Sequence, residues 1–372
     1  MSTVISDRPA VPAGRSPRRP PRRILLVLLV VAIAATAIAA VTVLVPDTDD
    51  RTGGYDVPVV IGAVPYWDEE AARRSIEANG QSLTVATPWT YSVAADGSVV
   101  PQVGIDAAGE AVQATWLRER GLSVIPTIAN TTEGAWDPVT ISTVLDDPGL
   151  RAIHIASIVE LVTTSGYDGI QIDYEDLIAA DRSAFSAFVG ELADSLHGID
   201  KLLYVTVHPK TSDEGYDGRN QAQDYAAIGD VADMIFVMTY DWHWETSSSG
   251  PIAPYGWMER VIQYAVSQIP AEKVVLGVGL YGYDWVDARG TAVTWEQVQA
   301  LADRYQVDEQ WDEASVSPHL SYTADDGRQH EVWYENDRSI EAKFDLARIY
   351  RLGGIGLWRL GGEDPGIWAP GP

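Results

Sequence analysis

The 372-residue chain contains no cysteine. It therefore forms no disulfide, thiolate metal site or iron–sulfur cluster, and it has no thiol nucleophile. Positive charge is also scarce, because 26 lysines and arginines stand against 53 aspartates and glutamates, for a net charge of −27. A chain this acidic is a poor ligand for a nucleic-acid backbone, so we expect no nucleic-acid partner. Four phenylalanines accompany 13 tryptophans and 17 tyrosines, and rings with a polar group favour a wet cleft over a dry core.

Histidine is sparse as well, and the six histidines do not have the spacing of metal ligands. We therefore expect no metal, and no motif in the chain predicts another cofactor. No feature of the sequence predicts an oligomer either, and we expect a monomer.

The N-terminal part of the chain differs from the rest in charge. Residues 1–23 are basic, residues 24–45 form a run of 22 without any charge, and residues 46–56 read as a polar linker. About 20 apolar residues span a bilayer as a helix, and arginines before the helix keep the N-terminus in the cytoplasm. The pattern predicts a single-pass membrane anchor with the acidic body outside the cell.

Two other interpretations of residues 24–45 stay open. A cleaved signal peptide would give a secreted protein, and Ala37-Ile38-Ala39 resembles a small-residue cleavage site. Signal peptides usually have an apolar region of about 7–15 residues, which is shorter than this run. The third interpretation is a buried helix of a soluble domain.

From residue 57 onward, short β-branched runs alternate with amphipathic stretches. The eight strand candidates are 57–67, 82–88, 122–128, 169–175, 202–209, 234–241, 274–282 and 354–360. Apolar residues at helical spacing predict a helix over 181–197, ended by Gly198. Continuous apolar strands alternating with helices are typical of a parallel sheet covered by helices, and eight units favour an α/β fold, the (β/α)8 TIM barrel. A doubly wound open sheet is the alternative, but no glycine-rich phosphate loop follows a strand.

The segment between the seventh and eighth strands is too long for one helix. Residues 294–305 are helical in pattern, 311–336 read as paired strands around Asp326-Gly327, and 337–352 return to helix. We expect a small α+β insertion at about 294–336 whose aromatic residues form one wall of a cleft.

The fourth strand candidate carries the chemistry. Strand alternation places Gln171, Asp173 and Glu175 on one face and Ile170 and Ile172 on the other. If the isoleucines meet the helices, the polar side chains point into the barrel and end at its carboxyl rim, where barrel enzymes keep their active sites. A salt-bridged core ladder is the structural alternative. It is disfavoured because the one cation near a neighbouring strand end, Lys210, cannot neutralise two carboxylates.

This run, DGIQIDYE at 168–175, resembles the D-G-x-D-x-D-x-E signature of glycoside hydrolase family 18, the chitinase-like barrels. Met238-Thr239-Tyr240-Asp241 is similar to the family's M-x-Y-D, and 332–358 is similar to its approach to a strand-eight tryptophan. Gly282-Tyr283-Asp284-Trp285 resembles the bacterial cell-wall and spore-lytic branch. The likeness extends over 57–372. One position departs from the pattern, because Gln171 stands where the signature has its middle aspartate.

The resemblance implies substrate-assisted hydrolysis of a glycan built from N-acetylhexosamine. Glu175 would be the general acid and base, Asp173 would hold the acetamide N–H of the sugar, and Tyr240 its oxygen. Gln171 offers only hydrogen bonds, so we expect an altered pH dependence, and loss of activity is the alternative. The remaining residues that the resemblance places in the substrate cleft are Asp241, Trp358, Tyr66 and Tyr281. Trp242 belongs to an aromatic loop after the sixth strand candidate that suggests stacking on a sugar, with packing at the rim as the alternative.

The sequence therefore predicts a membrane-anchored extracellular glycosidase acting on β-linked N-acetylhexosamine polymers, with bacterial wall glycan or a related surface polysaccharide favoured over chitin. The alternative is a glycan-binding, lectin-like barrel without catalysis. Retention of Glu175, the acid that family members lose when they become lectins, favours the enzyme.

Overall fold

The computed structural model describes residues 56–105, 107–214 and 218–369, which belong to one compact unit. The expected basic tail (1–23), the anchor (24–45) and nearly all of the linker lie outside the described residues, so they stay predictions. Among the described helices, none is long and apolar enough to cross a bilayer.

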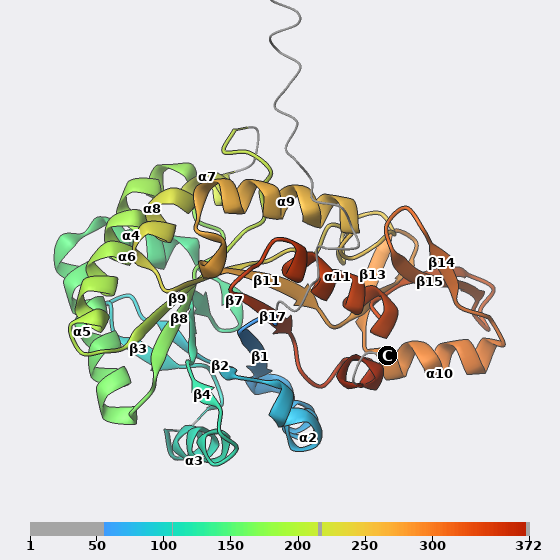
Figure 1. Cartoon of the computed structure of the whole chain (residues 1–372), viewed down its shortest axis with the longest axis horizontal. Helices are drawn as coiled ribbons and strands as arrows, with labels where there is room; N and C mark the ends of the chain where they lie inside the picture. Colours follow the sequence, from blue (N-terminus) through green and yellow to red (C-terminus); the bar gives the residue numbers. More distant parts are fainter. Residues whose placement is uncertain (1–55, 106, 215–217, 370–372) are drawn as a thin grey trace, which may run out of the picture. The chain divides into compact units, whose positions relative to one another are not determined.

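Eight parallel strand positions close into a barrel, which confirms that part of the sequence prediction (Figure 1). Because β1 pairs with β2 on one side and β17 on the other, the sheet has no open edge, and the doubly wound alternative is excluded. In chain order the strands are β1 (Val59–Pro65), β2 (Val85–Val93), β4 with β5 (Ser123–Val124 and Thr127–Ala129), β8 (Gly169–Asp173), β9 (Leu202–Val207), β10 (Met234–Val237), β11 (Val274–Gly279) and β17 (Gly354–Trp358). Three shorter strands complete this part: β3 (Val99–Pro101), which runs antiparallel to β2, and the β6–β7 pair (Thr131–Thr132 and Ala135–Trp136).

Helices connect these strands. They are α2 (Glu69–Asn79), α3 (Ala107–Arg118), α4 (Pro138–Asp146), α5 (Pro148–Ser165), α6 (Arg182–His197), α7 (Gly218–Ala222), α8 (Tyr225–Val231), α9 (Tyr255–Gln268) and α11 (Asp337–Ile349). Short 3-10 turns lie at Tyr66–Asp68, Gly80–Ser82, Ala179–Asp181, Ala271–Lys273 and Pro365–Trp368. The helix expected at 181–197 is confirmed as α6, and its apolar residues, for example Phe185, Phe188 and Leu192, are fully buried.

The two faces of β8 divide as strand alternation predicted. Ile170 and Ile172 are fully buried, and Tyr174, just past the strand, stacks on Phe188 of α6 on the helix side. Gln171 points the other way and donates a hydrogen bond of 2.8 Å to Thr206 on β9. The carboxylates that follow Gln171 on this face therefore reach the carboxyl rim of the barrel.

Glycine allows the barrel interior to close around one aromatic ring. A Cβ at Gly356 would lie 1.9 Å from the ring of Phe236, and a Cβ at Gly277 would lie 2.5 Å from the Val237 carbonyl oxygen. A larger residue at either position would displace Phe236, which lines the floor of the cavity above it. Gly277 of β11 and Gly356 of β17 thus serve close packing.

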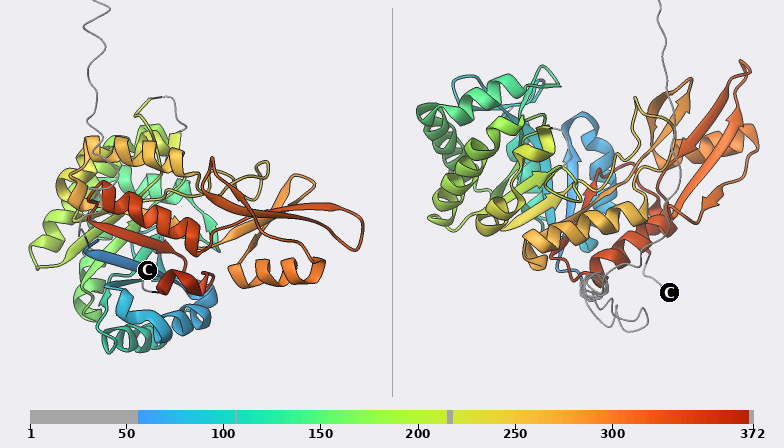
Figure 2. Two further views of the ribbon diagram at one scale, coloured as in Figure 1. Left: turned by 45° about the vertical axis from the view of Figure 1, so that its right-hand side comes forward. Right: turned by 90° about the horizontal axis from the view of Figure 1, so that it is seen from above.

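The insertion between β11 and β17 is larger than predicted. Its antiparallel sheet has the order β13-β12-β16-β15-β14 and begins at Gly282, so the expected start at residue 294 is wrong (Figure 2). Its elements are β12 (Gly282–Val286), β13 (Arg289–Val293), α10 (Trp295–Tyr305), β14 (Gln310–Asp312), β15 (Ser317–Thr323) and β16 (Gln329–Trp333). The sequence predicted one strand over 274–282, but β11 ends at Gly279 and Gly282 begins β12. The prediction ran the two together because the pairing of β12 with β13 and β16 is not visible in the local pattern.

Candidate active site

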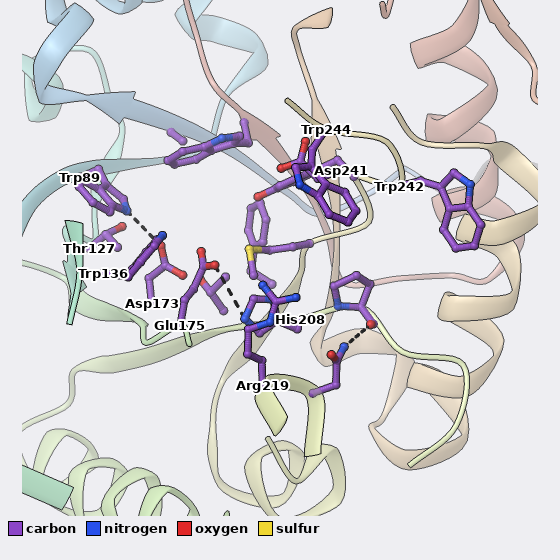
Figure 3. Close-up of a pocket in the computed structure, with 18 of the residues that line it drawn as sticks. Trp89, Thr127, Trp136, Asp173, Glu175, His208, Arg219, Asp241, Trp242 and Trp244 are labelled. Carbon is purple, nitrogen blue, oxygen red and sulfur yellow. Dashed lines mark hydrogen bonds and ion pairs between the residues drawn. The ribbon is translucent and has the colours of Figure 1, made fainter. Parts of the chain in front are cut away.

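A cavity of about 740 Å³ opens at the carboxyl ends of the barrel strands (Figure 3). Seven of the nine predicted site residues line this cavity: Gln171, Asp173, Glu175, Tyr240, Asp241, Trp242 and Trp358. They come from β8, β10, β17 and the loops that follow these strands, so separate parts of the sequence meet at one rim.

The other two predicted residues, Tyr66 and Tyr281, lie outside this cavity. The ring of Tyr66 stacks on Trp89, which itself lines the cavity, with 6.1 Å between ring centroids. The Tyr281 hydroxyl donates a hydrogen bond to Asp241, and its ring lines a second cavity of about 380 Å³. Both tyrosines therefore support wall residues rather than forming the wall of the first cavity.

Asp173 is held through one of its two carboxylate oxygens. The indole Nε1 of Trp89 donates a 3.0 Å hydrogen bond to Oδ2 of Asp173. The other oxygen, Oδ1, is buried and has no hydrogen-bond partner among the described residues. Burial raises the pKa of Asp173 to about 6, and the bond from Trp89 works in the opposite direction. A buried acceptor of this kind is suited to a donor that arrives with a ligand.

The backbone of Glu175 is fixed by Asn130, which follows β5. The Asn130 side chain donates to the Glu175 carbonyl oxygen at 2.9 Å and accepts from the Glu175 N–H at 2.8 Å. Asn130 is buried, so this paired contact is shielded from water. Because β8 ends at Asp173, the hydrogen bonds of the sheet do not fix the peptide of Glu175. The contact with Asn130 fixes it instead.

The carboxyl group of Glu175 lies in an environment that favours its protonated form. Burial raises its pKa well above the ordinary value, and the negative charges of Asp173, Asp176 and Asp241 raise it further. The nearby Arg219 guanidinium acts in the opposite direction. His208, at the end of β9, places its Nε2 3.8 Å from Oε2 of Glu175 (Figure 3). A carboxyl group that keeps its proton near neutral pH is able to act as a general acid.

The Tyr240 hydroxyl group also stays protonated. Burial raises the pKa of Tyr240 well above its ordinary value, with Asp173, Glu175 and Asp241 adding to the shift. Its O–H is therefore a hydrogen-bond donor within the cavity. Asp241 beside it has a pKa raised to about 6 by burial, partly offset by hydrogen bonds from Tyr281 and Tyr283.

Lys210 does not neutralise the carboxylates of β8. Its ammonium group donates to Asp213 at 2.7 Å and to the carbonyl oxygens of Asn220 and Gln223. Lys210 is therefore engaged by groups other than Asp173 and Glu175, which disfavours the salt-bridged ladder. Within the described residues, no group of three or more histidine, aspartate or glutamate side chains is placed to hold a metal ion.

Comparison with known proteins identifies the family. Residues 63–363 match the protein family described as Glycosyl hydrolases family 18. The chain belongs to this family of glycoside hydrolases. It is 37% identical over 291 residues to YdhD of Bacillus subtilis, whose name describes a sporulation-specific glycosylase; the match covers 75% of this chain and 66% of YdhD.

Two solved structures of family 18 type are similar over most of the barrel. The spore cortex-lytic enzyme SleL of Bacillus megaterium QM B1551 superposes with a TM-score of 0.76 at 30% identity, covering 84% of this chain and 72% of that one. A chitinase from Chromobacterium violaceum ATCC 12472 gives 0.78 at 30% identity, covering 84% and 96%. The chain spans between about half and two thirds of the length of the curated relatives that it matches first.

Seen as a family 18 site, the cavity contains several residues that sequence reasoning missed. Trp89 and Trp136 stand on one side of Asp173, and Arg219 stands near Glu175 on another (Figure 3). Asn130 acts behind the site. A usable signal existed for two of them. Trp89 is the first residue after the predicted strand 82–88 and Asn130 the second after 122–128, at the rim where barrel enzymes place functional side chains.

Proposed function

We propose that this chain hydrolyses β-linked N-acetylhexosamine glycans with net retention, using the acetamide of the substrate as the nucleophile. One observation carries the proposal. Glu175, whose carboxyl group favours the protonated form, shares a cavity with Asp173, whose buried Oδ1 has no hydrogen-bond donor among the described residues. Asp173 is the last residue of β8, Glu175 follows it by two residues, and both line the same cavity.

In the first step the Glu175 O–H donates its proton to the glycosidic oxygen, and the bond from that oxygen to the anomeric carbon breaks. The acetamide carbonyl oxygen of the same sugar bonds to the anomeric carbon, which gives an oxazolinium ion. Asp173 accepts the acetamide N–H through Oδ1, and the Tyr240 hydroxyl donates to the acetamide oxygen. Trp358 provides an apolar surface under the sugar ring. Holding the acetamide in place makes the attack intramolecular.

In the second step the Glu175 carboxylate takes a proton from water, and the hydroxide oxygen bonds to the anomeric carbon. The carbon–oxygen bond of the oxazolinium ring breaks and restores the acetamide. Two inversions at one carbon give retention. Between the two steps Glu175 is a carboxylate. It lies near the Arg219 guanidinium, whose positive charge stabilises it, and 3.8 Å from Nε2 of His208.

We also propose that the enzyme is anchored in the cell membrane by residues 24–45 and acts outside the cell. An anchor confines an enzyme to its own envelope, which favours bacterial wall glycan over imported chitin as the substrate. The names of the similar proteins point the same way, since SleL is described as a spore cortex-lytic enzyme.

The catalytic proposal is tested with Glu175→Gln in the full-length chain, on peptide-free wall glycan strands and on chitohexaose. General acid–base help is worth roughly 10²- to 10⁴-fold, so turnover should fall by that factor while glycan binding remains. Glu70→Gln, which makes the same change at an exposed carboxyl group of α2 outside the cavity, is the matched control and should keep full activity. Binding without turnover in the wild type would refute the proposal and support the lectin-like alternative.

The anchor is tested by cell fractionation. The full-length protein should sediment with membranes, and its body should be cleaved by external protease once the wall is removed. A mature form in the medium that begins near Ala39 would disprove the anchor and favour the signal peptide.

A further inference from the structure

A second cavity of about 380 Å³ adjoins the first. Asp241, Tyr283 and Trp358 line both cavities, so a chain of sugars seated on Trp358 continues directly from one to the other. The second cavity has room for part of the next sugar. Thr294 and Gln297 of the insertion line its far side with polar groups.

Arg359 brings a guanidinium to this second cavity. It follows Trp358 at the end of β17, and its NH1 donates a 2.7 Å hydrogen bond to Asp68. The contact with Asp68 engages one of the five N–H donors of a guanidinium and orients the rest of the group. Arg359 also lies 5.9 Å from the ring centroid of Trp67, an indole that is 49% exposed and offers an apolar face to a sugar.

Arg219 brings a second guanidinium to the first cavity, close to Glu175, and its NH1 lies 3.6 Å from Oδ1 of Asp176 (Figure 3). It reaches the cavity from α7, in the connection between β9 and β10, whereas Arg359 follows β17. Between β9 and β17 the barrel places β10 and β11, so the two arginines approach from different sides of the rim. In the described part of the chain, the lining of the two cavities contains these two arginines and no lysine.

We infer that Arg359 and Arg219 select a glycan in which the sugars flanking the cleaved N-acetylhexosamine carry a carboxylate substituent. The inference rests on the proposed function and names its substrate class: an alternating polymer of a neutral and an acid-substituted N-acetylhexosamine. Guanidinium–carboxylate pairs are stronger and more directional than neutral hydrogen bonds. The central position, between Asp173, Glu175 and Asp241, has negative groups and suits the neutral sugar.

The net charge of the chain makes these two cations necessary for such a substrate. A protein with a net charge of −27 repels an anionic polymer at long range, so attraction has to arise at contact distance inside the cleft. A neutral polymer such as chitin has no need of either guanidinium. A partly deacetylated, cationic polymer would be repelled by them.

The test measures binding, so that it does not depend on turnover. Full-length Glu175→Gln serves as the parent, and Arg359→Gln or Arg219→Gln is added to it. The probes are peptide-free strands of alternating N-acetylglucosamine and N-acetylmuramic acid, the same strands with their carboxyl groups converted to amides, and chitohexaose. We expect the parent to bind the acidic strands roughly 10- to 100-fold more tightly than the amidated strands, and each arginine variant to lose much of that preference.

Controls separate charge recognition from structural damage. Arg359→Lys keeps a positive charge and should retain part of the preference, and Arg74→Gln, which removes an exposed arginine of α2 outside both cavities, should retain all of it. Equal binding of acidic and amidated strands by the parent, or equal losses on all three probes in the arginine variants, would overturn the inference. Absence of turnover in the wild type with the preference intact would refute the proposed hydrolysis and leave the charge selection standing.

Discussion

Trp89 on β2 holds Asp173 on β8 by a single carboxylate oxygen, through a 3.0 Å hydrogen bond from its indole N–H. The opposite oxygen of Asp173 is buried without a partner among the described residues. The tryptophan therefore settles which oxygen of Asp173 faces the substrate. It also lowers the pKa of Asp173 against the effect of burial, which keeps the acceptor ionised over a wider range of pH.

Replacing Trp89 by phenylalanine should shift the pH dependence of kcat/KM. Loss of the N–H donor raises the pKa of Asp173 above about 6, so Asp173 becomes protonated at higher pH and the acidic limb of the profile moves upward. Trp136→Phe is the matched control, because Trp136 packs edge-on against Trp89 and lines the cavity. An acidic limb that moves equally in both variants would show that ring volume, not the hydrogen bond, controls the site.

Gln171→Asp should also move the acidic limb upward. Gln171 is buried on the same face of β8 as Asp173, and a second carboxyl group there raises the pKa of the pair, which titrates as a unit. Gln171→Asn gives a side chain as short as aspartate but without a charge. It therefore separates the effect of the charge from the effect of the shorter side chain. If the aspartate and asparagine variants give the same pH profile, position 171 is not coupled to the protons of the site.

Asn130→Ala should lower kcat more than it raises KM. The change leaves the N–H and C=O of Glu175 without their partner, costs about 1–3 kcal/mol in the free energy of unfolding, and lets the acid drift from the glycosidic oxygen. We expect a fall in kcat of roughly tenfold or more. Asn79→Ala, at an asparagine whose side chain donates a 3.2 Å hydrogen bond to the carbonyl oxygen of Ser75 in α2, is the control. A variant that loses stability but keeps kcat would assign Asn130 a purely structural role.

Lys343→Met should destabilise the fold strongly, and more so at high pH. Glu335 and Lys343 form a fully buried ion pair, and Ser339 donates a 2.6 Å hydrogen bond to the same carboxylate. Removing the cation costs about 3–5 kcal/mol in the free energy of unfolding. Burial raises the pKa of Glu335, and without Lys343 that pKa rises further, so the folded variant binds a proton more readily than the unfolded chain.

It follows that the stability of Lys343→Met is greatest at low pH and falls as the pH rises through the folded-state pKa of Glu335. Urea unfolding of the variant and the wild type at several pH values measures this difference. The double variant Glu335→Leu with Lys343→Met removes both charges and should recover most of the loss. A loss of stability that does not depend on pH would mean that packing, not the buried carboxylate, dominates.

Much of the barrel followed from the sequence because its determinants are local. The apolar periods over 181–197 and the runs at 169–175 and 202–209 each correspond to one helix or strand. The period of two along β8 also directs Gln171 and Asp173 to one side, since alternate residues of a strand share a face. Glu175 and Tyr240, which lie just past β8 and β10, line the same cavity, and Asn130 holds the backbone of Glu175 there.

The positions of Tyr66 and Tyr281 and the start of the insertion were decided by tertiary structure. Side chains beyond a strand end take their direction from contacts with other segments, as Tyr281 does with Asp241. Gly282 belongs to the inserted sheet because β12 pairs with β16, a strand more than forty residues later in the chain.

The amino-acid sequence by itself determined the order of the strands and helices, the inward face of β8 and the identity of its two carboxyl groups. Tertiary structure alone decided how the site side chains are held: which oxygen of Asp173 is left for a ligand, how Asn130 holds Glu175, and how Asp68 orients Arg359. The reason is physical. Side-chain direction within a strand follows from local geometry, whereas burial and hydrogen-bond partners arise when segments distant in the sequence meet around a closed barrel.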